Sequence, residues 1–243
     1  MLFSHSPQLR DDFPELVAGV CIANGITPDI DASANVAEFT ARAARRLEAG
    51  ALSEFPEIQA WRRAFARMGL KPTQYRCASE ALLRRLSREG SLPRIHPLVD
   101  LCNAVSAAYA VPIAALDLAR VDGDLQVRYA AGDETYQTFS GDEEHPQPAE
   151  VSYVDASGRA HARRWTNRQS GHSAVSPESV SVLMVAEGLH ATAIVDVPEL
   201  VAELAHEIGA LWRVQPLTAL LTETSPSAVA AITQADQGPS IRS

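Results

Sequence analysis

The highest density of hydrogen-bonding side chains in this chain lies between Ala160 and Ser173, in the run AHARRWTNRQSGHS. Three arginines, a tryptophan, an asparagine and a glutamine occur there without an acidic residue. The arginine guanidinium is a planar fork of donors that matches a carboxylate or a phosphate, and tryptophan adds a flat apolar surface. These residue types favour a binding surface for an anionic ligand. A solvated loop, or an edge strand protected by its charges, would have a similar composition.

Two amide side chains in this run, Asn167 and Gln169, add further hydrogen-bonding groups to this surface. The candidates for holding the ligand are Arg163, Arg164, Trp165, Arg168 and Ser170. The run Ser170-Gly171-His172-Ser173 also suggests a nucleophile, but an adjacent serine and histidine rarely form a working pair.

A second basic segment, residues 71–94, carries a net charge of +4, and residues 156–177 carry the same charge. The whole chain has a net charge of −9, so the remaining residues carry −17. If the two basic segments meet in the fold, they form a positive cleft on an acidic body. Such a cleft suits a shaped anionic ligand better than DNA, which is bound through extended positive charge.

Three residues of the second segment, Tyr75, Arg76 and Ser79, lie at the start of an expected helix. Main-chain N–H groups at a helix start attract anions, so these residues are further candidates for ligand binding. Asn103 falls in the middle of the next expected helix, where asparagine has a poor propensity. A polar lining of a pocket would explain its presence there, and so would exposure to solvent.

The apolar periodicity predicts the elements that position these residues. Helices are expected to begin at Ser33 and Pro56, to include Leu82–Leu86, to follow Pro97 and to begin again at Pro198. Strands are expected at residues 16–22, 111–117, 125–129, 151–154, 160–165, 180–186, 190–195 and 212–221. The strands at 151–154 and 160–165 flank a turn and should form a hairpin. The simplest assignment is one α+β domain.

The domain is assigned to residues 14–222, preceded by an N-terminal segment (1–13) and followed by a tail (223–243) expected to be disordered. No apolar run approaches the ~20 residues of a membrane helix. The N-terminus lacks the pattern of a signal peptide, and three separated cysteines fit reduced thiols, so a cytoplasmic protein is expected. The seven histidines show no metal-ligand spacing, and no metal or other cofactor is predicted.

Four stretches together resemble the editing domain of the phenylalanyl-tRNA synthetase beta subunit, in its free-standing form. They are YRCASEALLRR (75–85), LPRIHPLVDLCNAVS (92–106), VPIAALD (111–117) and residues 160–170. The resemblance spans roughly residues 14–221. It implies an α+β domain with a mixed or antiparallel β-sheet flanked by helices, and a pocket for an aromatic amino acid on the tRNA 3′ end.

The resemblance also concerns individual residues. Glu187, which follows the strand expected at 180–186, matches a glutamate that the synthetase uses to recognise the wrong amino acid. Where the synthetase has a histidine in its Pro-Leu-His-Ala-Phe-Asp motif, this chain has Ala114. Where the synthetase has a small, glycine-rich wall, this chain has residues 163–168. These departures indicate a rebuilt pocket, so the tyrosine specificity of the synthetase is not carried over.

Two functions fit these observations. In the first, the protein binds the tRNA 3′ end and is a deacylase, hydrolysing the ester of mischarged aminoacyl-tRNA in trans with an oriented water. Asn167, Gln169 and Glu187 would then be catalytic, because an editing site can work by orienting a water molecule and polarising the ester carbonyl. In the second, it is a non-catalytic binding module for an amino acid or another small carboxylate. Both require that Arg163, Arg168 and Glu187 line one pocket, and neither predicts an oligomeric state or a membrane partner.

Overall fold

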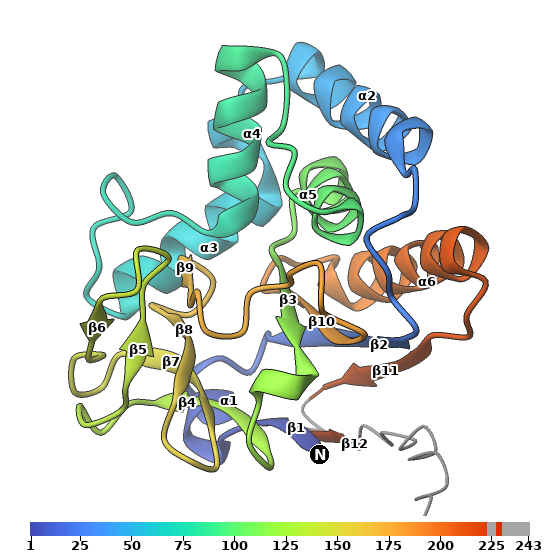
Figure 1. Cartoon of the computed structure of the whole chain (residues 1–243). Helices are drawn as coiled ribbons and strands as arrows, with labels where there is room; N and C mark the ends of the chain where they lie inside the picture. Colours follow the sequence, from blue (N-terminus) through green and yellow to red (C-terminus); the bar gives the residue numbers. More distant parts are fainter. Residues whose placement is uncertain (223–226, 230–243) are drawn as a thin grey trace, which may run out of the picture.

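The computed structural model describes residues 1–222 and 227–229, and it is built around a four-stranded antiparallel sheet (Figure 1). Its strands, in the order β11-β2-β10-β3, are β11 (Leu217–Leu221), β2 (Val17–Asn24), β10 (Ser181–Gly188) and β3 (Ile113–Asp117). The two inner strands, β2 and β10, are buried over almost their whole length. This burial explains why their sequences are nearly continuous apolar runs.

A six-stranded mixed sheet forms the second layer, in the order β12-β1-β4-β7-β8-β9. Its strands are β12 (Ser227–Val229), β1 (Leu2–His5), β4 (Leu125–Tyr129), β7 (Val151–Asp155), β8 (Ala160–Arg163) and β9 (Arg168–Gln169). Strand β1 runs parallel to β4, and the other neighbours are antiparallel. The predicted hairpin is confirmed as the β7–β8 pair. A two-stranded ribbon, β5 (Tyr136–Gln137) and β6 (Glu143–Glu144), lies beside this sheet.

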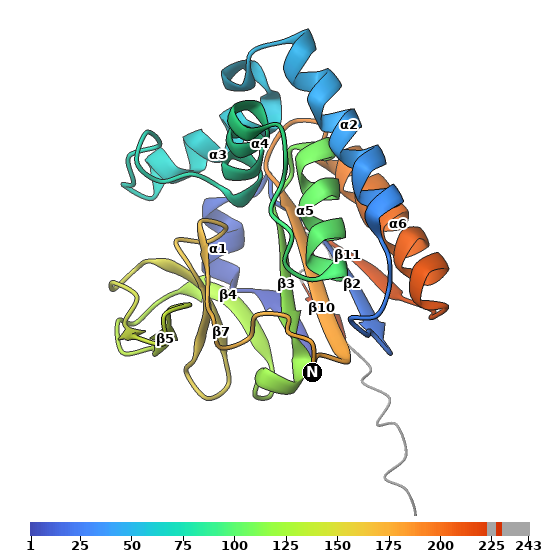
Figure 2. The ribbon, with the colours of Figure 1, turned by 45° about the horizontal axis from the view of Figure 1, so that its top comes forward.

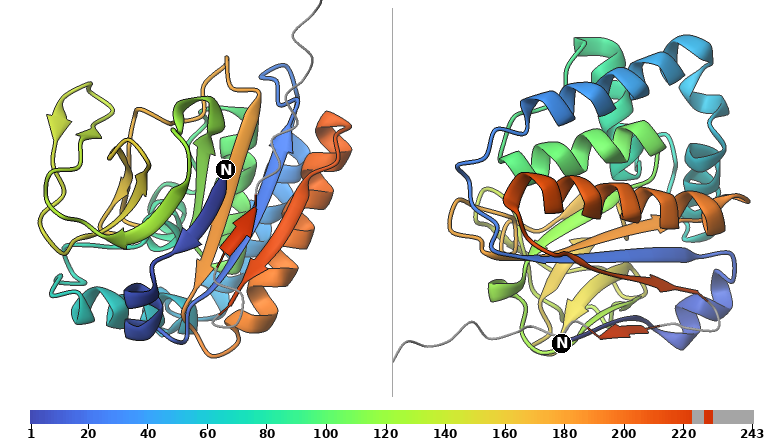
Figure 3. Two further views of the ribbon diagram at one scale, coloured as in Figure 1. Left: turned by 90° about the horizontal axis from the view of Figure 1, so that it is seen from below. Right: turned by 90° about the vertical axis from the view of Figure 1, so that its right-hand side faces the viewer.

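The longer helices gather on one side of the four-stranded sheet (Figures 2 and 3). They are α2 (Ser33–Ala49), α3 (Pro56–Arg67), α4 (Ala78–Glu89), α5 (Pro97–Tyr109) and α6 (Ala193–Trp212); the short α1 (Pro7–Asp12) follows β1. Helix α6 packs on β2, β10 and β11, and α2 covers α5. A Cβ atom at Gly19 of β2 would lie 2.5 Å from a methyl of Val201, so α6 approaches β2 this closely only over a glycine. The predicted α+β class, with sheets flanked by helices, is confirmed.

Three predicted elements need correction. Residues 190–195 are not a strand: the carbonyl of Thr192 accepts from the N–H groups of Val195 and Asp196, so α6 begins at Ala193 and contains Pro198. A six-residue run with β-branched residues is too short to distinguish a strand from the first turns of a helix. The last strand starts only at Leu217, because α6 extends to Trp212. Strand β10 continues to Gly188, so Glu187 lies within the sheet rather than after it.

Residues 1–13 are part of the domain rather than a separate segment, because β1 pairs with β4 in the larger sheet. Most of the tail expected to be disordered lies outside the described residues, although Ser227–Val229 form β12 against β1. All three cysteines are buried free thiols. None of the helices in the described ranges has the length and apolar character needed to span a bilayer.

Candidate functional site

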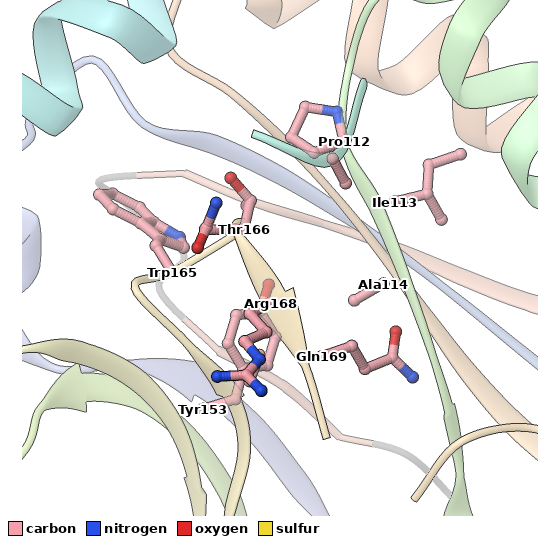
Figure 4. Close-up of a pocket in the computed structure, with 11 residues that line it drawn as sticks. Pro112, Ile113, Ala114, Tyr153, Trp165, Thr166, Arg168 and Gln169 are labelled. Atoms are coloured by element: carbon pink, nitrogen blue, oxygen red, sulfur yellow. The ribbon is translucent and has the colours of Figure 1, made fainter. Parts of the chain in front are cut away.

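A pocket with a cavity volume of about 60 Å³ lies between the start of β3 and the turn that joins β8 to β9 (Figure 4). Its wall consists of Ala78, Pro112, Ile113, Ala114, Tyr153, Ala162, Trp165, Thr166, Asn167, Arg168 and Gln169. Five consecutive wall residues, 165–169, come from the run singled out in the sequence. The opposite wall is the apolar start of β3, which includes Ala114. The synthetase editing domain that the sequence resembles has a histidine at this position.

The β8–β9 turn owes its shape to two residues with left-handed backbone. Arg164 has φ +48° and Trp165 has φ +58°, although neither is glycine. Such conformations cost about 1–3 kcal/mol each and persist only where packing enforces them. Here the Trp165 N–H donates to the Val151 carbonyl at 2.7 Å, and its buried ring stands edge-on between the rings of Phe13 and Trp61. This anchoring presents the next three residues, Thr166 to Arg168, to the pocket.

Behind the pocket, Glu187 holds both aromatic wall residues. Its carboxylate accepts the Trp165 indole N–H at 3.0 Å and the Tyr153 hydroxyl, and it also contacts His5 Nε2 at 2.7 Å. Burial and the neighbouring Glu187 carboxylate raise the pKa of Tyr153 well above 10, so the phenol remains a donor. All four residues are at least 97% buried. The aromatic wall is therefore fixed by one carboxylate.

The N-terminal segment completes this network. Arg10 Nη2 lies 2.9 Å from His5 Nδ1 and its Nη1 donates to the Leu16 carbonyl at 2.6 Å. Arginine can only donate, so His5 Nδ1 is the acceptor, and its Nε2 carries the hydrogen that Glu187 accepts. The His5 ring is thus neutral in this arrangement. Two of the five residues in this network, Arg10 and His5, lie outside the expected domain boundary.

The expectation that Glu187 lines the pocket is wrong. The residue is 1% exposed, and both of its oxygens already accept hydrogen bonds from other side chains. A substrate hydroxyl or ammonium group would find no free acceptor there. In this geometry Glu187 positions Tyr153 and Trp165. The hydroxyl of Tyr153 donates the hydrogen bond to Glu187 that the resemblance would assign to a substrate.

Stability should fall as the pH falls from 7 to 5. Burial lowers the pKa of His5, His96 and His172 below the ordinary 6.5. Near pH 6 the unfolded chain therefore binds more protons than the folded one, and the free energy of unfolding decreases towards acid, by at most about 1.4 kcal/mol per pH unit for each ring. Carboxylates contribute mainly below about pH 4.5. Urea unfolding at half-unit pH steps measures the slope.

The control for this pH dependence is His206→Gln, because His206 is an exposed histidine on α6. Its slope between pH 7 and 5 should match that of the wild type, whereas His5→Gln should have a shallower slope. A free energy of unfolding that is flat from pH 7 to 5 in the wild type would contradict the prediction.

The two amide candidates lie in the pocket wall with their orientation fixed. Asn167 Nδ2 donates to the Arg76 carbonyl at 2.7 Å, and Gln169 Nε2 donates to the Ala115 carbonyl at 2.7 Å. The amide oxygens have no partner among the residues that the structure describes. These oxygens are acceptors, which suits them to orient a water molecule or to receive an ammonium group. Polarising a carbonyl, the other role considered from the sequence, requires donors.

Two wall residues with hydroxyl groups, Thr166 and Tyr153, were not singled out as site residues in the sequence. Thr166 has a buried hydroxyl without a hydrogen-bond partner in the described part of the chain, so it is a candidate contact for a ligand. In the sequence, the signal for Thr166 was its position between two candidate residues, Trp165 and Asn167. Tyr153 lies on β7, and only the hairpin prediction, which pairs β7 with the run after the turn, could have indicated it.

The arginines of the run do not form a carboxylate-free cluster. Arg163 is 4% exposed, forms two bonds to Glu150 at 2.9 and 3.0 Å and a third to Glu144 at 2.6 Å, and does not line the pocket. Burial alone would raise the pKa of Glu150, but its bonds with Arg163 hold it below the ordinary value. Arg163 therefore stabilises the fold through these ion pairs. The prediction that Arg163 lines the pocket is wrong.

The other two arginines differ in their access to a ligand. Arg168 is exposed, lines the pocket, and forms an ion pair with Glu144 at 3.0 Å. Exposed pairs contribute about 0–1 kcal/mol, so an anionic ligand can compete for this guanidinium. Arg164 turns away from the pocket: its guanidinium lies 4.9 Å from the ring centre of Tyr75, in a neighbouring hollow.

The two basic segments do meet, as one prediction required, but the expected anion site at the start of α4 is not formed. The Ala78 N–H donates to the Thr166 carbonyl at 2.9 Å, and Ala78 is the α4 residue that lines the pocket. Tyr75 packs on Arg164, and Arg76 lies 3.6 Å from Glu80. Ser79 is fully buried beside the Cys77 thiol. None of the three lines the pocket.

The two remaining candidates also lie elsewhere. Asn103 is half-buried on α5 and is absent from the pocket wall. Ser170 is buried, and its hydroxyl donates to the Gln137 carbonyl at 2.8 Å. A buried chain of Ser173, His161 and Asp155 has contacts of 2.8 and 3.1 Å, but Ser173 is 0% exposed. This chain ties the β8 hairpin together, and neither serine is available as a nucleophile.

The fold and the site define an α+β domain with an aromatic-backed pocket and polar side chains at one wall. The sequence profile of the B3/4 domain matches residues 60–199, which is more than half of the chain. The chain belongs to the B3/4 domain family.

Curated relatives include phenylalanine–tRNA ligase beta subunits. That of Legionella pneumophila is 38% identical over 56 residues, 23% of this chain and 7% of the relative. That of Shewanella oneidensis is 31% identical over 74 residues, 30% of this chain and 9% of the relative. The chain thus matches less than a tenth of these relatives. An N-terminal fragment of the phenylalanyl-tRNA synthetase beta subunit from Pyrococcus horikoshii superposes with a TM-score of 0.46 at 8% identity, covering 88% of this chain and 49% of that one.

Proposed function

We propose that this protein hydrolyses the ester bond of mischarged aminoacyl-tRNA in trans. The observation that carries the proposal is the pair of amides, Asn167 and Gln169, whose nitrogens are tied to main-chain carbonyls while their oxygens remain as acceptors in a pocket wall. Membership of the B3/4 family, whose relatives above are phenylalanine–tRNA ligase beta subunits, supports the choice of substrate class.

In the proposed reaction a water held by the two amide oxygens attacks the ester carbonyl. The bond between the carbonyl carbon and the ribose oxygen breaks, and a proton from the attacking water passes to the departing oxygen. The products are a free amino acid and a tRNA with an intact terminal ribose. An aminoacyl ester is activated enough for positioning and electrostatics to supply much of the catalysis.

The charges and surfaces of the pocket support roles for two further groups. Arg168 would exchange its exposed ion pair with Glu144 for the terminal phosphate of the tRNA. The substrate side chain would rest against the aromatic and aliphatic wall made by Tyr153, Trp165 and Ala114, which carries no free charge. This lining favours an uncharged amino acid. No metal or other cofactor is part of the proposal.

Filling the pocket should abolish the activity. Ala114 is a half-buried wall residue on β3, so Ala114→Phe places a ring in the space that the substrate side chain would occupy. We expect the deacylation rate over a panel of aminoacyl-tRNAs to fall at least about 100-fold, because access to the near-attack position is lost. Ala219→Phe, at an exposed position of β11, is the matched control and should keep the wild-type rate. Equal rates in both variants would place the chemistry outside this pocket.

One observation favours a second function, a non-catalytic module that binds an amino acid or another small carboxylate. The wall contains no histidine, aspartate, glutamate or cysteine, so it offers no general base, whereas Arg168 could hold a carboxylate. A thermal-shift screen with free amino acids separates the two functions. Strong stabilisation by one amino acid without hydrolysis of its tRNA ester would favour the binding module.

A further inference from the structure

Three side chains from two distant parts of the sequence meet at the start of two helices. Glu57 is the second residue of α3, Asp196 lies in the first turn of α6, and His190 lies in the loop between β10 and α6. One oxygen or nitrogen of each lies within 4.8 Å of the others. Glu57 and His190 are buried, and Asp196 is partly exposed. None of the three lines the pocket described above.

The hydrogen bonds define the tautomer of His190. Its Nε2 lies 2.7 Å from Asp196 Oδ2, which also accepts the Thr192 hydroxyl at 2.6 Å. A carboxylate can only accept, so the hydrogen is on Nε2 and the lone pair of the neutral ring is on Nδ1. A carboxylate that accepts from one ring nitrogen and leaves the other free is the usual support of a metal-binding histidine.

The free atoms of this cluster point to a ligand. Nine buried side-chain nitrogen and oxygen atoms within the described ranges have no hydrogen-bond partner, and two of them are His190 Nδ1 and Glu57 Oε2. His190 is 96% buried and Glu57 is 92% buried. A buried lone pair and a buried carboxylate oxygen without partners each cost free energy unless something binds them. A cation is one partner that two acceptors can share.

We propose that Glu57, His190 and Asp196 form a site for a divalent transition-metal ion, for which Zn²⁺ is the best match. His190 Nδ1 and Glu57 Oε2 are the protein ligands, Asp196 orients the imidazole from the other ring nitrogen, and water completes the coordination. An imidazole nitrogen and a carboxylate oxygen are donors that zinc accepts at about 2.0–2.2 Å.

Neighbouring groups allow this arrangement. Arg46 is the nearby cation, but it bonds Glu57 through Oε1 at 2.7 Å and the Ala108 carbonyl at 2.9 Å, so Oε2 remains free for a single metal bond. Gly188 lets the imidazole fold back over the chain, because a Cβ atom there would lie 3.2 Å from His190 Cε1. The partly exposed Asp196 leaves a route from solvent.

The test is calorimetric titration of the chelator-treated full chain with ZnCl₂. The proposal expects one zinc ion per chain, and its affinity should fall about 10- to 100-fold in Asp196→Asn, as for an orienting carboxylate, and further in His190→Ala and Glu57→Gln. The matched control is His206→Ala, an exposed histidine on α6, which should bind zinc as the wild type does. No stoichiometric binding by the wild type, or unchanged binding by His190→Ala, overturns the proposal.

A second readout protects the test against misfolded variants. Circular dichroism establishes whether each variant is folded. If His190→Ala is not folded, Glu57→Gln decides the outcome, because it preserves the shape of the side chain. Zinc should raise the thermal midpoint of the wild type and of His206→Ala but not of Glu57→Gln. Equal stabilisation of all three by zinc would mean that the ion binds elsewhere, and the site assignment would fail.

Discussion

Replacing Glu187 by alanine is expected to lower the free energy of unfolding by about 3–5 kcal/mol, the range found when one partner of a buried charged network is removed. The reason is geometric. His5, Tyr153 and Trp165 all donate to this carboxylate, and each would keep a buried N–H or O–H without an acceptor. Urea unfolding followed by tryptophan fluorescence measures the loss.

Glu187→Gln separates the charge from the shape. Its amide keeps one acceptor but turns an NH₂ group towards neighbours that are themselves donors, so an intermediate loss of about 1–3 kcal/mol is expected. Glu199→Gln is the matched control, because Glu199 is an exposed glutamate on α6 and its replacement should change stability by less than about 0.5 kcal/mol. A Glu187→Ala protein as stable as this control would show that Glu187 does not hold the pocket wall.

The largest expected loss of activity, besides filling the pocket, follows from removing either amide. Asn167→Ala and Gln169→Ala should each lower the rate of deacylation about 100-fold, because the water would lose one of the two acceptors that aim it. Each variant also loses one hydrogen bond to a main-chain carbonyl, worth about 1 kcal/mol, so both should stay folded. Single-turnover rates with the preferred aminoacyl-tRNA measure the effect.

Gln59→Ala provides the control for the amide variants. Gln59 is exposed on α3, and its Nε2 donates to the Ser53 carbonyl at 3.1 Å, so the variant loses the same kind of bond away from the pocket. It should retain the wild-type rate. If Asn167→Ala and Gln169→Ala retain it as well, the amides do not orient the attacking water.

The helices and the inner strands could be predicted because their signals are local. Ser33, Pro56 and Pro97 are the first residues of helices. The two prolines mark helix starts because a proline at the first position loses no helical hydrogen bond. The apolar run before Asn24 became the buried strand β2. Residues 190–195 were misassigned because so short a run with β-branched residues fits either a strand or a helix, and the hydrogen bonds to the Thr192 carbonyl identify the helix.

The site was only partly predictable, because its electrostatics depend on contacts between distant residues. Composition identified the run that lines the pocket, and it also suggested a cluster of unpaired arginines. Glu144 and Glu150, 19 and 13 residues before Arg163, neutralise that cluster in the fold. One partner of Glu187, His5, lies 182 residues away. No local pattern encodes such pairs.

The initial rate of ester hydrolysis by the wild-type chain, over a panel of correctly and incorrectly charged tRNAs, tests the central claim most directly. The proposed function predicts that at least one mischarged species with an uncharged side chain is hydrolysed far faster than in buffer, while correctly charged species are spared. Rates equal to those in buffer for every member of the panel would contradict it.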